Sequence, residues 1–578
     1  MNRDIEGMVK DFDVVVIGGG IVGAATFREL CMSGLNVLLV EKDDFCNDIS
    51  SGSTEMAHGG FRYLLTLKDW SLVIESIVER ETLHYIAPHL VSRLNFYMPL
   101  YAGDEMYFNP SFPGMDLPDV NWRIGGYGGL GTFMVGMGMN MYKLFALYGI
   151  RSRKLGSDVS EVGYEKLHSG EILSRGFNLN PEGLTACYKY TDSNIEDVER
   201  LVVETILSGL DYADCNGGAC AALNRTEFAG FADGGELVIR CLDDDWEFRV
   251  KPRAVVNATG ANINAINDKL ENKEANDIHM IAGAHLIVPR SYWNNDDRRA
   301  AVAWWINKKI MFAISKGTDR LLLGTHERYI PAEEVDKRNY NYREDLDTML
   351  EKTRKAFPGL DFDVEDYCYY TRVRPLKPDE KHLAGGGNPT RFSRRDYLRR
   401  IGNVISVSGK LGPSRCLAEH VARTVFEILD RPAPASITSH EKLSGGHFEG
   451  TVEDYIPRAA AAFPAAGPQI VENVVRRFGS AFLRILSNRP EGALAPVDPE
   501  CPDSQPMASL LYAFEQEGAR NMTHAFRRTG AYKHLSEGLN CIENATQFVG
   551  RRMGWDDARV QSEIENYKEY IAERRIIK

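Results

Sequence analysis

Residues 13–41 read DVVVIGGGIVGAATFRELCMSGLNVLLVE, and this stretch decides the fold of the first part of the chain. It begins with a β-branched run, Asp13 to Ile17, which is typical of a strand buried on both faces of a parallel sheet. After a glycine-rich turn, Ile21 to Ser33 predict a helix that ends at Gly34. A second apolar strand follows at Val37 to Val40. This order predicts the βαβ unit of a parallel sheet.

The glycines of the turn have the GxGxxG spacing of a dinucleotide-binding loop. Gly18 permits the tight turn, Gly20 lets the backbone approach a pyrophosphate, and Gly23 lets the helix pack closely on the strand. The N-terminus of the helix presents free N–H groups and the positive end of its dipole to that pyrophosphate. Glu41 ends the second strand, where its carboxylate can accept hydrogen bonds from ribose hydroxyls and would repel a 2′-phosphate. The motif therefore predicts a dinucleotide other than NADP.

Two downstream segments favour FAD over NAD. Ala254 to Gly260 reads AVVNATG, and two-domain FAD enzymes have a similar Ala-Thr-Gly segment beside the dinucleotide. Val404 to Lys410 reads VISVSGK, a strand that opens into a glycine turn before a helix. Backbone N–H groups there would point at the flavin ring and stabilise negative charge on the reduced flavin. The long separation of these segments predicts a discontinuous FAD domain with substrate-binding insertions.

Composition narrows the function further. A chain of 578 residues is too long for one hydrophobic core and predicts two or three domains. The net charge of −13 argues against a nucleic-acid partner. Ten cysteines without a CxxC pair predict reduced thiols and no metal site in a cytoplasmic protein. Neither a secretory signal nor a run of about 18 apolar residues is present, and the Met-rich stretch Gly129 to Gly149 is interpreted as a buried or interfacial helix.

A longer motif gives the chain a family resemblance. Residues Ser50 to Leu64 read SSGSTEMAHGGFRYL. A serine-rich loop, then His-Gly-Gly, then Arg-Tyr-Leu stands at the same place in the FAD-dependent glycerol-3-phosphate dehydrogenases, which belong to the superfamily of D-amino-acid oxidase. The chain resembles that family over nearly its whole length, with further matches at Ala87 to Leu90, Val373 to Leu376, Gly409 to Leu411 and Phe526 to Thr529.

The resemblance implies an α/β fold of three parts. We expect a two-domain FAD-binding Rossmann-type (glutathione-reductase-like) fold, with an antiparallel-sheet substrate domain and a C-terminal helical cap domain. The FAD domain would comprise residues 1–100, 180–275 and 365–435. The substrate domain would fill 101–179 and 276–364, and the helical domain 446–578.

The implied activity is that of an FAD-dependent oxidoreductase acting on a CH–OH group. It would oxidise the secondary alcohol of glycerol 3-phosphate or a related polyol phosphate by hydride transfer to flavin N5. Quinone or oxygen would then reoxidise the flavin, and quinone use would bring a cytoplasmic protein into peripheral contact with the inner face of the membrane. The oligomeric state is open, a homodimer included. Three alternative functions also stay open: the same scaffold oxidising another specialised hydroxylated metabolite or acting as an oxygen-using oxidase, an amine or amino-acid oxidase, and a flavin-binding protein without redox turnover.

The candidate site residues fall into three groups. A guanidinium binds phosphate through two parallel hydrogen bonds, lysine acts as a point charge, and histidine has a pKa near working pH. The expected catalytic residues are His58, Arg62, Arg374 and Lys410, with His58 either the base for the substrate hydroxyl or a residue that orients the flavin loop. The expected substrate-binding residues are Tyr63, Arg372, His285, His326 and Arg415. The expected cofactor-binding residues are Gly18, Gly20, Ile21, Val22, Gly23, Glu41, Lys42, Ser50, Ser51, Ser53, Thr54, His58, Gly59, Gly60, Ala219, Ala258, Thr259, Gly260, Gly409, Lys410 and Leu411.

Several positions of the expected pocket depart from the pattern of the family. Glu55 and Ala282 stand where that family usually has lysines, Arg372 replaces a glycine, and Gly412 replaces a threonine. A phosphate dianion within about 4–6 Å of Glu55 would be repelled by its carboxylate. Either Glu55 points away, or the phosphate binds elsewhere, or the substrate is not glycerol 3-phosphate.

Three further segments have expected roles. Tyr101 to Gly131 is rich in Gly, Pro and aromatic residues and is interpreted as a lid or substrate-entry element. Trp304 and Trp305 are predicted to lie in the core of the substrate domain. The basic tail Arg574 to Lys578 is interpreted as an ordinary frayed terminus.

Overall fold

The fold is taken from a computed structural model. It describes residues 11–60, 70–108, 120–123, 129–153, 163–244, 246–306, 309–331, 341–361, 363–364, 368–377 and 396–577. Arg62 and Tyr63 lie outside these ranges. The hypothesis of a lid at Tyr101 to Gly131 also falls mostly outside them, although a two-stranded sheet of β4 (Glu105–Phe108) and β5 (Val120–Arg123) belongs to that stretch.

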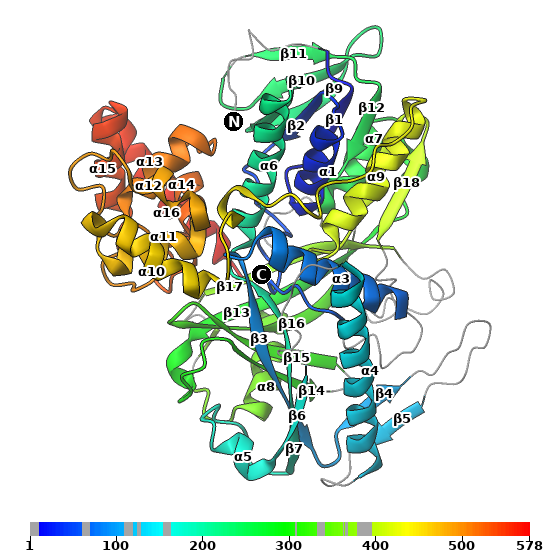
Figure 1. Cartoon of the computed structure of the whole chain (residues 1–578), viewed down its shortest axis with the longest axis vertical. Helices are drawn as coiled ribbons and strands as arrows, with labels where there is room; N and C mark the ends of the chain where they lie inside the picture. The colour runs from blue at the N-terminus through cyan, green and yellow to red at the C-terminus, as the bar shows by residue number, and fades with distance from the viewer. Residues whose placement is uncertain are drawn as a thin grey trace.

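The first large sheet has six strands in the order β18-β19-β12-β1-β2-β8 (Figure 1). Its strands pair in parallel, except that β18 runs antiparallel to β19 at one edge. Helices pack on one face, and a three-stranded antiparallel sheet packs on the other. The strands are β1 (Val14–Ile17), β2 (Val37–Glu41), β8 (Ala221–Asn224), β12 (Ala254–Asn257), β18 (Tyr397–Ile401) and β19 (Val404–Ser408); the helices are α1 (Ile21–Met32), α6 (Val198–Cys215) and α9 (Ser414–Ile428); the second sheet is β9 (Thr226–Phe231), β10 (Leu237–Cys241) and β11 (Glu247–Val250).

The second large sheet has eight strands in the order β17-β13-β16-β15-β14-β3-β7-β6. Neighbouring strands are antiparallel except β14 and β3. Helices α3 and α4 cover one face, and α5 and α8 cover the other. The elements are β3 (Val91–Tyr101), β6 (Tyr164–His168), β7 (Leu184–Ile195), β13 (His279–Pro289), β14 (Ala300–Ile306), β15 (Lys309–Lys316), β16 (Arg320–Ile330), β17 (Cys368–Leu376), α3 (Trp70–Ile86), α4 (Leu130–Arg153), α5 (Ser169–Leu173) and α8 (Arg343–Ala356).

This topology confirms the predicted α/β class and moves the expected domain boundaries. Strands β3, β7 and β17, which we expected in the FAD domain, pair within the eight-stranded sheet of the substrate domain. A strand belongs to the domain whose sheet it pairs with, and the local sequence of a strand does not show which sheet that is. Trp304 and Trp305 are buried on opposite faces of this sheet, so their predicted place in the core is confirmed.

The Met-rich stretch forms most of α4. Its inner side packs on the eight-stranded sheet through Val135 and Met139, while Phe133 and Leu144 are 66% and 65% exposed. Across the described ranges, no helix has both the length and the apolar character needed to cross a bilayer.

The C-terminal part is a helical domain that lies beside the six-stranded sheet (Figure 1). It has two small apolar cores, one of α10 to α12 and one of α13 to α16. Its helices are α10 (Val452–Ala462), α11 (Pro468–Phe478), α12 (Phe482–Leu486), α13 (Met507–Gln516), α14 (Met522–Thr529), α15 (Ile542–Met553) and α16 (Asp557–Arg574).

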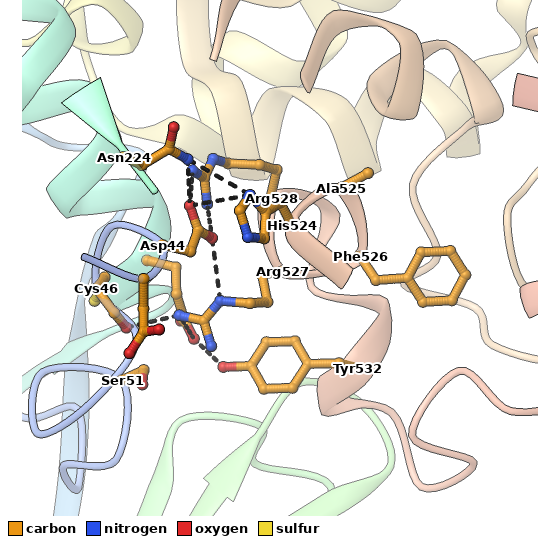
Figure 2. A network of polar contacts seen from close by, with 12 residues as sticks. Asp44, Cys46, Ser51, Asn224, His524, Ala525, Phe526, Arg527, Arg528 and Tyr532 are labelled. Atoms are coloured by element: carbon orange, nitrogen blue, oxygen red, sulfur yellow. Dashed lines mark hydrogen bonds and ion pairs between the residues drawn. The ribbon is translucent and has the colours of Figure 1, made fainter. Parts of the chain in front are cut away.

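A buried ionic cluster joins the helical domain to the FAD domain (Figure 2). Both oxygens of Asp44 accept hydrogen bonds from Arg528, at 2.6 and 2.7 Å, and Arg527 Nε lies 3.3 Å from Asp44 Oδ2. All three side chains are at most 2% exposed. Burial opposes the charge of Asp44, but Arg528, His524 and Arg527 together hold its pKa well below the usual range.

We predict that Asp44→Asn destabilises the protein because it leaves two buried guanidinium groups uncompensated. Breaking a buried ion pair in this way costs about 3–5 kcal/mol. The pKa of Asp44 is depressed in the folded protein, so its stabilisation is complete above the unfolded pKa and is lost as the pH falls through the folded value. Thermal unfolding of the variant should therefore show a lower midpoint, by the same margin at every pH above about 5.

Asp243→Asn is the matched control, because Asp243 pairs with Arg225 where both side chains are 29% exposed. Such a surface pair contributes about 0–1 kcal/mol. Equal midpoints for the two variants would contradict the structural role of Asp44.

Candidate functional site

A cavity of about 1080 Å³ lies where the six-stranded sheet, the eight-stranded sheet and the end of α16 meet. Its walls come from segments far apart in the sequence: the glycine-rich loop, the end of β2, residues 47–58, the turn after β12, strand β17 and residues 408–413. Tyr570, Glu573, Arg574 and Ile576 of the C-terminal end complete the lining.

The glycine-rich loop forms one end of the cavity. Gly18 has a φ of +107°, and a Cβ atom there would lie 2.6 Å from the carbonyl oxygen of Ala258. A Cβ atom on Gly23 would lie 1.8 Å from the carbonyl oxygen of Gly18, so α1 begins directly against the loop. Gly20 and the first residues of α1 line the cavity, and the N–H of Ile21 donates to Ser50 Oγ at 3.0 Å. A backbone this close to a helix N-terminus fits a pyrophosphate.

Glu41 lies at the end of β2 on the same wall. Its carboxylate accepts hydrogen bonds from the N–H of Gly19 at 2.7 Å and of Asp43 at 2.8 Å. Burial raises the pKa of Glu41 to about 7, although these two donors favour its ionised form. A carboxylate fixed beside the loop fits the ribose of a dinucleotide. The loop and Glu41 together therefore fit FAD.

The lining of the cavity also contains the candidate catalytic side chains. His58 follows the serine-rich loop, Arg374 comes from β17, and Lys410 follows β19. The guanidinium of Arg374 forms an ion pair of 2.5 Å with Glu327. The backbone N–H of Lys410 donates to Asp396 at 3.3 Å. These side chains place a titratable imidazole and two cations in one cavity with the glycine-rich loop.

Most of the predicted residues within the described ranges come together in this cavity. Those that line it are His58, Arg372, Arg374, Lys410, Gly18, Gly20, Ile21, Val22, Glu41, Lys42, Ser50, Ser53, Thr54, Ala258, Thr259, Gly260, Gly409 and Leu411. In the described ranges, no cluster of His, Cys, Asp or Glu side chains is arranged to hold a metal ion.

Three predicted substrate-binding residues are not part of the lining. Arg415 forms buried ion pairs with Glu79, at 2.6 Å, and with Glu419, so its charge is used inside the FAD domain. His285 lies on β13, beside β17 in the same sheet, and contacts Thr325 at 3.1 Å, and burial together with Arg374 and Arg372 lowers its pKa to about 3. His326 lies 3.6 Å from Asp345.

Five predicted cofactor-binding residues also lie outside the lining. The Ser51 hydroxyl donates to the carbonyl of Asp48, and the N–H of Ala219 donates to Asn36. The N–H of Gly59 donates to Asp192, which the family pattern alone did not indicate. Gly23 contacts Gly18 of the glycine-rich loop and does not reach the cavity. Gly60 has a φ of +77°.

Glu55 points away from the cavity, which is the first of the three alternatives above. It forms ion pairs with Lys533 at 2.5 Å and with Lys316 at 3.1 Å. Lys533 belongs to the helical domain and also pairs with Glu199. The carboxylate of Glu55 is therefore neutralised at the domain interface.

The C-terminal end contributes residues that the sequence analysis missed. Asn341 Nδ2 donates to the carbonyl of Arg574 at 2.7 Å, and the hydroxyl of Tyr369 donates to the carbonyl of Arg575. The expectation of a frayed terminus is therefore wrong for these residues. The sequence did contain a pattern that predicts this packing. One side of α16 carries Tyr567, Tyr570 and Arg574 at helical spacing, and this side faces inward.

Comparison with known proteins agrees with this geometry. The family described as "FAD dependent oxidoreductase" matches residues 13–407. The glycerol-3-phosphate dehydrogenase of Synechocystis sp. is 24% identical, covering 98% of this chain and 97% of the relative. The aerobic glycerol-3-phosphate dehydrogenase of Escherichia coli is 27% identical, covering 89% and 93%. The solved glycerol-3-phosphate dehydrogenase from Bacillus halodurans, complexed with FAD, has a TM-score of 0.70 at 20% identity, covering 98% and 96%.

We predict that Gly23→Ala weakens FAD binding at least about tenfold, because the new Cβ atom would force α1 away from the loop. The visible absorbance of flavin per mole of purified protein measures the retained cofactor. Gly170→Ala in α5 is the control, since a Cβ atom there meets nothing within 4 Å. Full FAD content in Gly23→Ala would contradict the close approach of loop and helix.

Proposed function

Because the chain belongs to the family of FAD-dependent oxidoreductases, we propose that it oxidises the secondary hydroxyl of glycerol 3-phosphate or a related polyol phosphate. One observation carries the proposal: His58, Arg374 and Lys410 line the same cavity as the glycine-rich loop that fits FAD. The two relatives named above are glycerol-3-phosphate dehydrogenases and align along nearly their whole length. Their names support the same class of substrate.

The residues of the cavity divide the work of such an oxidation. FAD, when bound, supplies the acceptor for the hydride from the carbinol carbon. His58 accepts the proton of the substrate hydroxyl, since imidazole has a pKa near neutral pH and this side chain faces the cavity. Lys410 places a positive charge beside Gly409, where it stabilises negative charge that develops during the reaction.

Arg374 acts mainly by orientation. Its ion pair with Glu327 fixes the guanidinium at the cavity wall, and its remaining N–H groups can donate to the substrate. Arg62 and Tyr63 stay candidate pocket residues on the strength of the family motif alone, since they lie outside the described ranges.

The electron acceptor is quinone or oxygen. Oxygen use would release hydrogen peroxide with each turnover, whereas quinone use would require peripheral contact with a membrane. Peroxide formation by the purified protein in the presence of substrate distinguishes the two.

We predict that glycerol 3-phosphate, added without oxygen, bleaches the visible absorbance of the bound flavin, and that glycerol does so far less efficiently. His58→Asn should slow this reduction by about 10²-fold or more at unchanged FAD content, because the hydroxyl proton loses its acceptor. Stopped-flow absorbance measures both effects. His447→Gln, an exposed position outside the cavity lining, is the matched control.

An oxidised flavin after addition of glycerol 3-phosphate, still reducible by dithionite, would exclude this substrate. Reduction by amines or amino acids in its place would favour the amino-acid oxidase alternative. A flavin that no alcohol or amine reduces would favour a flavin-binding protein without redox turnover.

A further inference from the structure

Arg372 is a cation that lines the cavity, with an 18% exposed side chain and little compensation from the protein. Its side chain crosses Gly52 so closely that a Cβ atom there would lie 2.0 Å from Arg372 Cγ. One terminal nitrogen donates to the carbonyl of Thr371 at 3.0 Å, whereas Nε is buried without a hydrogen-bond partner in the part of the chain that the structure describes. Asp48 Oδ1 lies 3.9 Å from this Nε, and the Asp48 side chain is 53% exposed, which weakens the pairing.

Arg574 brings a second guanidinium to the same wall. It ends α16, is held there by the hydrogen bond from Asn341, and lies over the ring of Tyr532 at 5.1 Å. Its Nε also is buried and lacks a hydrogen-bond partner among the described residues. Burial opposes its charge, but Tyr570 and Glu537 hold the pKa of Arg574 above its usual value, so the group stays cationic.

Tyr570 reports the electrostatic potential between the two arginines. Burial alone would raise the pKa of its phenol, yet Arg574, Arg527 and Arg372 lower it below the usual value. Tyr570 also lines the cavity. A buried phenol with a lowered pKa indicates that the positive charge at this wall exceeds what nearby carboxylates cancel.

Other arginines near the cavity are neutralised by carboxylates of the protein. Arg374 pairs with Glu327, Arg415 with Glu79, and Arg575 with Glu537. Arg372 and Arg574 differ from these arginines, because among the described residues Arg574 forms no ion pair within 4 Å and Arg372 has only Asp48, at 3.9 Å. Each keeps an unused N–H donor at the same cavity wall, which indicates a site for a ligand of negative charge.

We propose that Arg372, Arg574 and the hydroxyl of Tyr570 form an anion-binding subsite that holds the phosphate of the substrate. The assignment rests on the proposed function above and specifies where its substrate binds. Guanidinium groups match a phosphate dianion by parallel N–H···O hydrogen bonds, and two of them balance its charge. The charge of Arg374 is already neutralised by Glu327. The phosphate is therefore bound at the part of the cavity wall that the C-terminal residues Tyr570 and Arg574 form.

The test measures anion binding separately from turnover. Inorganic phosphate is titrated into the oxidised holoenzyme, and its Kd is obtained from the change in the flavin spectrum and from calorimetry. We expect Arg372→Met and Arg574→Met each to weaken phosphate binding about 10- to 100-fold. Glycerol 3-phosphate should lose affinity by a similar factor, while its limiting rate of flavin reduction and the slow reaction with glycerol change little. Arg574→Lys should restore part of the affinity.

Arg551→Met is the matched control, because Arg551 is exposed on α15 and lies outside the cavity lining. Wild-type affinity for phosphate in both cavity variants, or no phosphate binding by the wild-type holoenzyme, would overturn the subsite. Loss of FAD from either variant would also overturn it, because the arginines would then serve the cofactor pyrophosphate.

Different results would contradict the anion subsite and the proposed function. If phosphate binds through the two arginines but glycerol 3-phosphate leaves the flavin oxidised, the anion subsite stands and the substrate is a different anionic compound. If glycerol 3-phosphate reduces the flavin and both variants bind it as the wild type does, the function stands and the subsite falls.

Discussion

A carboxylate near the start of the chain and two guanidinium groups near its end fix the helical domain on the FAD domain. Asp44 follows β2 of the six-stranded sheet, and Arg528, 484 residues later, donates to both of its oxygens (Figure 2). Because these groups are buried, each is stable only while the others are in place. The cluster fixes α14 on the FAD domain, and α14 packs on α16, so the cluster also holds Arg574 at the cavity. The C-terminal domain is thus a structural part of the candidate site.

The portion of the site that the sequence predicted is the portion built by local geometry. Gly23 and Glu41 act through contacts with Gly18 and Gly19 within one βαβ unit, and their spacing alone specifies those contacts. The Ala-Thr-Gly turn after β12 and the glycine turn after β19 were predictable for the same reason. Both follow apolar strands of the parallel sheet, and the carboxyl ends of these strands meet at the cavity, where open α/β sheets bind their ligands.

The portion that was not predicted depends on pairing between distant residues. Arg415 was expected to bind the substrate, but its ion pairs with Glu79 and Glu419 hold it inside the FAD domain. Strands β3, β7 and β17 have ordinary strand sequences, and only their neighbours assign them to the eight-stranded sheet. The tail after α16 has a composition typical of a solvated terminus, whereas Asn341 and Tyr369 tie its backbone to the cavity wall.

The substitutions that separate this chain from the family it resembles redistribute charge in a consistent way. Glu55, where that family usually has lysine, pairs with Lys533 of the helical domain, so its charge is neutralised across the domain interface. Arg372 stands where the family usually has glycine. Its side chain has room because residue 52, which it crosses, is a glycine and has no Cβ atom. The serine-rich loop thus has an acid in place of a lysine, while β17 and α16 bring Arg372 and Arg574 to the cavity wall. A ligand phosphate in this cavity is consequently attracted toward the junction with the C-terminal domain, and the cation that receives it depends on the docking of that domain.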